Sequence, residues 1–189
     1  VERLLAHPAT DVNQAKTTTG STPLFIACQK NHLAVVERLL AHPATDVNQA
    51  KTTTGSTPLF IACQKNHLAV VERLLAHPAT DVNQAKTTDG ATPLFMACEN
   101  GHVDILKPLL DKGADWSIGM RGNGWSPLFV ASWAGKAAVV AELLARKAAD
   151  PATVTTSDHL EIPAGSTALS VAELKGHDEV AALLRDWSG

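Results

Sequence analysis

The sequence predicts an all-α solenoid, built from stacked helix-loop-helix units that are joined by projecting β-hairpin loops. The chain compared with itself at an offset of 35 residues shows that Val1–Thr53 recurs unchanged as Val36–Thr88. The dipeptides that open the units continue beyond these copies at intervals of 35, 35, 34 and 41 residues: Thr22-Pro23, Thr57-Pro58, Thr92-Pro93, Ser126-Pro127 and Thr167-Ala168. Such a period is typical of solenoids, in which each unit buries its apolar face against its neighbours.

Each unit is predicted to begin with a short helix. Thr22 precedes Pro23, and this pair favours a helix start because the hydroxyl can accept from a free backbone N–H while proline fits the first helical position. Leu24, Ala27 and Cys28 then fall at positions i, i+3 and i+4, so they lie on one apolar face.

A second helix is predicted after a tight turn. Asn31 tolerates the left-handed conformation found past helix ends, and the later units have glycine in its place: Gly101, Gly135 and Gly176. The second helix has its apolar face at Leu33, Val36, Leu39 and Leu40. It stops before Pro43, and the turn-rich segment 46–55 that follows is predicted to form the projecting loop.

Four short motifs recur in this order along the chain: Gly20-Ser21-Thr22-Pro23-Leu24, Asn31-His32, Leu39-Leu40 and Asp46-Val47-Asn48. Together they resemble the ankyrin repeat signature. The resemblance covers essentially the whole chain. It implies antiparallel helix pairs stacked into a curved solenoid, with the hairpins and the first helices lining a concave face.

We expect a single domain that contains a half repeat, four repeats and a C-terminal capping repeat: 1–16, 17–51, 52–86, 87–120, 121–161 and 162–189. The interval of 41 residues predicts a long exposed finger between Asp150 and Ala164, because an inserted backbone stays solvated in a projecting loop. Asp178, Glu179 and Arg185 make the last helix pair polar, which is typical of a capping repeat.

No polar face of this kind precedes the first repeat. Val1, Leu4 and Leu5 are predicted to lie on an apolar helix surface that normally packs on a preceding repeat. We therefore expect either further repeats upstream or a head-to-head homodimer formed through this uncapped N-terminal repeat.

One departure from the ankyrin pattern concerns a polar contact between repeats. Phe25, Phe60, Phe95 and Phe129 stand where the family usually has a histidine that hydrogen-bonds to the neighbouring repeat. The sequence therefore predicts that this contact is lost.

The composition excludes several function classes. A formal net charge of −3 without any run of Lys or Arg argues against a nucleic-acid partner. No apolar stretch approaches the roughly 20 residues of a membrane span, so no membrane partner is expected. Cys28, Cys63 and Cys98 recur at one repeat position, and adjacent units about 10 Å apart are too distant for a disulfide. This favours a reducing, intracellular location, in the cytoplasm or the nucleus.

Neither a metal site nor catalysis is predicted. The pairs Cys28 and His32, Cys63 and His67, and Cys98 and His102 have helical spacing, but a zinc site needs about four converging ligands. A catalytic thiol needs a base within reach and a cleft. Buried small thiols and loop histidines explain the pattern better, so we expect no enzyme activity, no metal and no cofactor.

The resemblance implies that the chain binds a partner protein on its concave face. The residues predicted to make contact are Ser21, Gln29, Lys30, Ser56, Gln64, Lys65, Asp89, Glu99, Asn100, Trp125 and Trp133. We expect Trp125 and Trp133 to be exposed and to dominate binding, with Asp89 and Glu99 selecting a positively charged partner. Two alternatives stay open: a structural or elastic spacer from a longer array, and an engineered repeat protein.

A modification pattern also recurs. Leu5–Asn13, Leu40–Asn48 and Leu75–Asn83 each read leucine, five residues, then Asp-Val-Asn. This resembles the ankyrin pattern that is modified by the asparaginyl hydroxylase acting on hypoxia-inducible factor, with Asn13, Asn48 and Asn83 as the acceptors. A purely structural role of Asp-Val-Asn in building the hairpin is the favoured alternative.

Overall fold

The computed structural model describes residues 7 and 10–187. In this part of the chain it contains ten α-helices: α2 (Pro23–Gln29), α3 (Leu33–Leu40), α4 (Pro58–Gln64), α5 (Leu68–Leu75), α6 (Pro93–Asn100), α7 (Val103–Asp111), α8 (Pro127–Trp133), α9 (Ala137–Ala145), α10 (Ala168–Lys175) and α11 (Asp178–Asp186).

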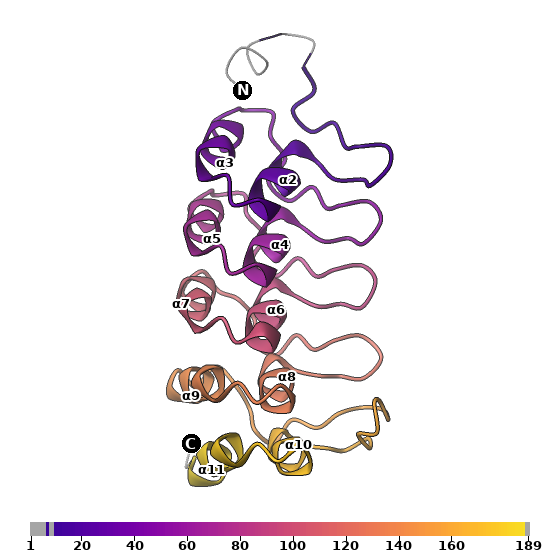
Figure 1. The fold of residues 1–189 in the computed structure, drawn as a ribbon, viewed down its shortest axis with the longest axis vertical. Helices are drawn as coiled ribbons and strands as arrows, with labels where there is room; N and C mark the ends of the chain where they lie inside the picture. Colours follow the sequence, from indigo (N-terminus) through magenta and orange to yellow (C-terminus); the bar gives the residue numbers. More distant parts are fainter. Residues whose placement is uncertain (1–6, 8–9, 188–189) are drawn as a thin grey trace.

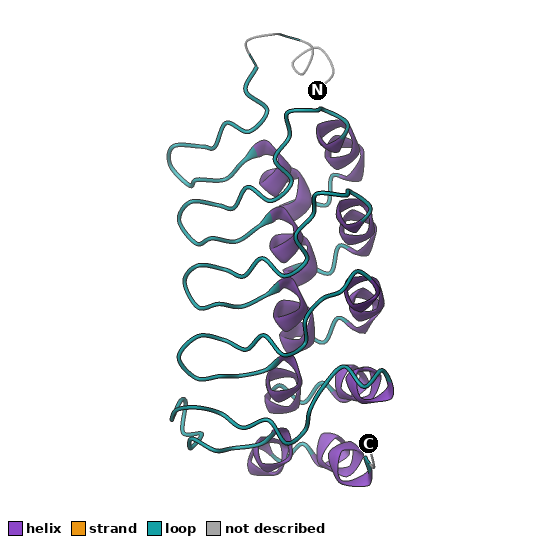
Figure 2. Cartoon of the chain, turned by 180° about the vertical axis from the view of Figure 1, so that it is seen from behind, coloured by secondary structure: helices purple, strands orange, loops and turns teal. Residues whose placement is uncertain are grey.

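The helices form two parallel columns (Figure 1). The first helices α2, α4, α6, α8 and α10 stack on one another, the second helices α3, α5, α7, α9 and α11 stack beside them, and each first helix contacts its own second helix. Loops project from the side of the first helices, away from the second helices, as Figure 2 shows from behind. The predicted all-α solenoid is confirmed.

The first helices begin where the sequence predicts. The hydroxyl of Thr22 accepts a hydrogen bond of 3.1 Å from the backbone N–H of Phe25. The same cap recurs at Thr57, Thr92, Ser126 and Thr167. Because the cap fixes the start of every first helix, residues at equal distance from it face the same way in each repeat.

The turn between the two helices also follows the prediction. Asn31 and Asn66 have φ angles of 58° and 57°, and Gly101 has 80°. This left-handed residue reverses the chain, so the second helix begins within two or three residues and runs back along the first.

One continuous apolar core lies between the two columns. It includes Phe25, Phe60, Phe95 and Phe129, all buried. Cys28, Cys63 and Cys98 are buried and unpaired. Ser132 takes the cysteine position in the next repeat, and its hydroxyl donates to the carbonyl of Leu128 at 2.9 Å. Serine therefore fits the cysteine position.

The projecting loops are hairpin-shaped, but within the described residues their arms form no regular β-strands. The N–H of Lys51 donates to the carbonyl of Ser56 at 2.9 Å, and the N–H of Gly55 donates to the carbonyl of Lys51 at 2.8 Å. Adjacent loops are joined by the N–H of Thr52, which donates to the carbonyl of Gly20 at 3.2 Å. A Cβ atom on Gly20, whose φ is 68°, would collide with Thr52, so glycine permits this close stacking.

The longest loop connects α9 to α10. Its tip contains an isolated antiparallel bridge between His159 and Ile162. Ile162 is buried, whereas Leu160 is 58% exposed. The inserted residues therefore pack one apolar side chain inward and expose the tip.

Candidate interaction groove

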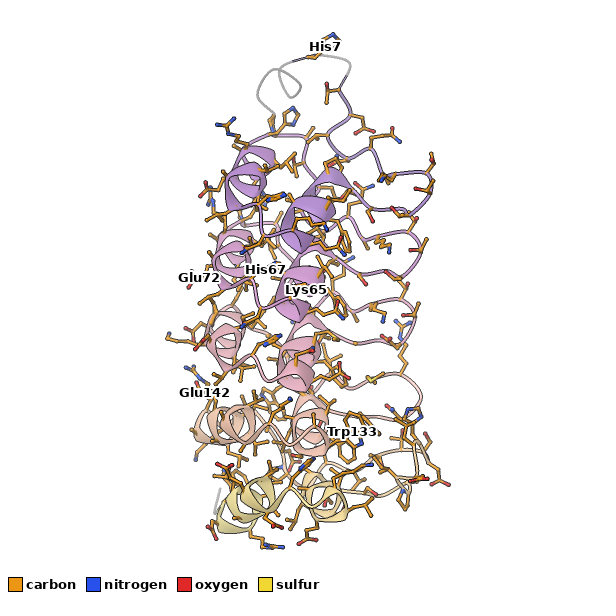
Figure 3. All side chains as sticks on the ribbon, viewed as in Figure 1. His7, Lys65, His67, Glu72, Trp133 and Glu142 are labelled. Carbon is orange, nitrogen blue, oxygen red and sulfur yellow. The ribbon has the colours of Figure 1, made fainter. Side chains whose placement is uncertain are left out.

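The residues at the seventh position of each first helix lie in one row, which we call the inner row. Each stands six residues after the first residue of its helix: Gln29, Gln64, Glu99, Trp133 and Leu174. Figure 3 labels Trp133 in this row and Lys65 beside it, on the side of the first helices. Buried positions in the same helices keep leucine and alanine, whereas the inner row changes from polar to acidic to apolar.

A hollow of about 370 Å³ adjoins the inner row in the first described repeat. Its walls come from α2 and from two loops: Lys16, Thr19, Ser21, Phe25, Ile26, Gln29, Lys30 and Lys51. Gln29 and Lys30 are exposed. The surface at this end is therefore hollowed between the helices and the loops.

In the first four described repeats the position after the loop glycine lies inside the molecule, which corrects a sequence prediction. Ser21 and Ser56 are both 7% exposed, and Trp125 is 4% exposed. The carbonyl of Ser56 accepts a hydrogen bond from the N–H of Lys51 at the start of the same loop, and the Ser56 hydroxyl accepts a hydrogen bond of 2.9 Å from Thr54. These side chains close the base of the loop, so Ser21, Ser56 and Trp125 offer little surface to a partner.

Trp125 is the centre of an aromatic cluster. Its ring centroid lies 5.1 Å from that of Phe129 and 5.5 Å from that of Trp133. His159, from the long loop, meets Trp125 edge-on at 5.3 Å. The prediction that both tryptophans are exposed is therefore wrong for Trp125: the inserted loop covers it. Trp133 is half-buried, and the ammonium of Lys175 lies 5.9 Å from its ring centroid.

The acidic residues of the third repeat face a lysine of the same chain. Lys86 Nζ lies 2.6 Å from Asp89 Oδ2 and 5.8 Å from the ring centroid of Phe60. Burial raises the pKa of Asp89, but the hydrogen bonds from Lys86 and from the N–H of Ala91 outweigh it, so the pKa lies below its usual range. Burial and the charge of Asp89 raise the pKa of Glu99. Asp89 is therefore already neutralised within the chain, which weakens the prediction that it selects a cationic partner.

A family model described as ankyrin repeats (3 copies) matches residues 1–86 and 78–155. The chain belongs to the ankyrin repeat family. Ankyrin repeats generally mediate protein–protein interactions, and ankyrin repeat proteins are typically adaptors without enzyme activity. A search of the curated proteins finds no match.

The loop asparagines of this ankyrin stack join successive repeats. Asn48 Oδ1 accepts from the N–H of Asp81 at 2.9 Å, and Asn48 Nδ2 donates to the carbonyl of Ala79 at 2.6 Å. Asn13 and Asn83 contact the next loop in the same way. Both ends of each amide are engaged, which supports a structural role; hydroxylation of Asn13, Asn48 and Asn83 stays a prediction.

Histidines before the second helices replace the polar contact that the phenylalanines remove. His67 Nδ1 lies 2.9 Å from the carbonyl oxygen of Cys28 in the preceding repeat. His102 and His177 make the equivalent contacts with Gln64 and Trp133, at 3.3 and 3.0 Å. From the sequence, His67 and His102 were predicted only to be loop histidines, and His177 was not singled out. Their recurrence at one repeat position was the signal that pointed to a shared structural role.

Leu174 is a further surface residue that was not predicted from the sequence. It ends the inner row and is 60% exposed, although its repeat is otherwise polar: Glu173, Asp178, Glu179 and Arg185 are exposed, and Arg185 Nη2 lies 2.5 Å from Glu173 Oε1. Aligning Leu174 with Gln29 would have identified it.

Other predictions concern metals, membranes and dimers. Within residues 7 and 10–187, no cluster of three or more His, Cys, Asp or Glu side chains is arranged to hold a metal ion. No helix in the same residues is long and apolar enough to cross a membrane. Val1, Leu4 and Leu5, on which the predicted head-to-head homodimer depends, lie outside the described residues.

Proposed function

We propose that this chain is a protein-binding adaptor that holds its partner against the inner row and the adjoining loops. The observation that carries the proposal is the contrast between the inner row and the core. Leu24, Leu59, Leu94 and Leu128 are buried and unchanged, whereas the inner row changes from glutamine in the first two repeats to Glu99, Trp133 and Leu174. Packing of the stack does not require this variation, and a spacer gains nothing from it.

The proposed contact residues follow from exposure. Gln29, Lys30, Lys65 and Asn100 are exposed, and Gln64, Glu99 and Trp133 are partly exposed. We add Leu174, because an exposed leucine beside a tryptophan can insert into an apolar pocket of a partner. A rigid row of this kind allows several weak contacts to act together. The buried thiols are consistent with a partner in a reducing compartment, the cytoplasm or the nucleus.

Site-specific photocrosslinking tests the proposal. A photoreactive amino acid is placed at position 64, at the end of α4, or at position 72, which is exposed on α5 in the outer column. Figure 3 labels Glu72 on that column and Lys65 beside position 64. We expect a defined protein to crosslink from position 64 and not from position 72. Crosslinking from position 72 alone would overturn the proposal.

A further inference from the structure

The inner surface of the first two described repeats carries lysines and no carboxylates. Segments 12–36 and 47–71 contain no Asp or Glu, and their basic residues include Lys16, Lys30, Lys51 and Lys65. Three of these four lysines line the hollow beside α2. Among the ion pairs formed by the described residues, none involves any of the four. This end of the surface therefore has uncompensated positive charge.

The charge changes abruptly at the third repeat. Asp89 stands where the preceding repeat has Thr54, and Glu99 stands where it has Gln64. Lys86, equivalent to Lys51, is paired with Asp89. Beyond this acidic repeat the inner row becomes apolar, with Trp133 and Leu174. The surface thus has a basic end and an apolar end.

We propose that this surface binds an extended acidic segment of a partner protein. Its carboxylates lie over Lys16, Lys30, Lys51 and Lys65, and a large apolar residue reaches Trp133 and Leu174. The inference rests on the proposed function and names the chemistry of the partner. The partner segment is therefore negatively charged, opposite to the positively charged partner that Asp89 and Glu99 suggested from the sequence.

The spacing of the repeats defines the pattern of that segment. Packed helices lie about 10 Å apart, and an extended chain advances about 3.3 Å per residue, so one repeat corresponds to about three residues. Acidic side chains are therefore expected at every third position. The apolar residue is expected about six residues beyond the last of them, because Trp133 lies two repeats after Lys65.

A protein segment fits this surface better than a nucleic acid does. Nonspecific binding of single strands combines a continuous basic track with aromatic side chains on which bases stack. Here Asp89 and Glu99 interrupt the lysines, which return at Lys175, and the aromatic side chain beside the first lysines, Phe25, is 3% exposed. Carboxylates at intervals of one repeat match lysines that recur at the same interval, Lys16 with Lys51 and Lys30 with Lys65.

Fluorescence anisotropy with a synthetic peptide tests the inference. The probe is a labelled peptide of about twelve residues, with glutamate at every third position and a leucine about six residues beyond the last glutamate. Matched peptides have glutamine or lysine in place of glutamate. We expect the acidic peptide alone to bind, and more weakly at high salt.

Lysine variants locate the binding. Lys30→Ala with Lys65→Ala is expected to weaken binding of the acidic peptide about fivefold, in keeping with exposed charge pairs. The control is Lys107→Ala with Lys112→Ala, which removes the same charge from the exposed side of α7 and its end. We expect the control to change affinity less than twofold. Equal loss in both pairs, or equal binding of the glutamine or lysine peptide, would overturn the inference.

Two outcomes separate this inference from the proposed function. The first outcome is that an oligouridylate of equal charge binds more tightly than the acidic peptide and loses affinity in the Lys30 and Lys65 variant. This would identify a general polyanion-binding surface and overturn the inference that an acidic protein segment binds there. A protein that crosslinks from position 64 through a basic or neutral segment would also overturn it, while the proposed function stands.

Discussion

Asn48 Oδ1 accepts a hydrogen bond of 2.9 Å from the backbone N–H of Asp81, which lies 33 residues further along the chain. Asn48 Nδ2 donates to the carbonyl of Ala79 in the same neighbouring loop at 2.6 Å. One side chain thus satisfies two backbone groups of the next repeat. Since the same pair of contacts recurs at Asn13 and Asn83, this ladder sets the spacing of the loops.

Asn48→Ala is expected to lower the free energy of unfolding by about 1–3 kcal/mol, because two backbone groups lose their partners. Urea unfolding followed by circular dichroism measures the change. Gln14→Ala is the control, since Gln14 is exposed and its side chain reaches only the adjacent carbonyl, at 3.4 Å. An equal loss in both variants would show that the ladder contributes nothing specific.

The histidines before the second helices allow a comparison within one chain. His67→Ala removes the 2.9 Å contact with the Cys28 carbonyl, so we expect it to cost about 1 kcal/mol of stability. His32 stands at the same position before α3 and is exposed, and its side chain makes no hydrogen bond to the described residues. His32→Ala should therefore cost much less. Equal unfolding midpoints of the two variants in urea would contradict a stabilising contact between repeats.

Local chemistry in the sequence was enough to predict the helices. The Thr22-Pro23 pair fixes the start of α2, and Asn31 supplies the left-handed residue that ends its turn. Both effects depend on a few neighbouring residues, and they recur in every repeat.

Contacts between distant residues could not be predicted in the same way. Trp125 is covered by His159, which comes from the inserted loop, and nothing in the local sequence indicates how that loop folds back. The pairing of His67 with Cys28 likewise depends on how adjacent repeats are stacked. The exposure of Gln29 on the inner row and of Lys30 beside it was predicted correctly, because it follows from helical periodicity.

The buried cysteines predict that stability falls at alkaline pH. Burial raises the pKa of the Cys28 thiol to about 12 and raises those of Cys63 and Cys98 as well. Above about pH 8.5 the thiols of the unfolded chain ionise while those of the folded chain stay protonated. The unfolded state then binds fewer protons, so the free energy of unfolding decreases as pH rises.

We expect each cysteine to contribute about 2 kcal/mol to the loss of stability between pH 8 and pH 10. The chain contains no tyrosine, which removes one other group that ionises near this range. Urea unfolding at both pH values measures the loss. The triple variant with serine at the three positions should lose correspondingly less, and Ser132 shows that serine fits this site. An unchanged pH dependence in that variant would contradict the assignment.

The two tryptophans of the fourth repeat are expected to separate stability from binding. Trp125 is 4% exposed and packs on Phe129 and His159, so Trp125→Ala should cost about 3–5 kcal/mol of stability, as other large core truncations do.

Trp133 lies half-buried on the inner row. Trp133→Ala should cost less stability and reduce binding by about tenfold or more, because an aromatic contact in an interface often contributes about 2 kcal/mol. The measurements are urea unfolding and the yield of the protein crosslinked from position 64. The double variant is therefore not expected to keep the wild-type stability, and single variants are needed. The opposite result would place the contact at Trp125. In that case Trp133→Ala would crosslink as the wild type does, and a folded Trp125→Ala chain would no longer crosslink.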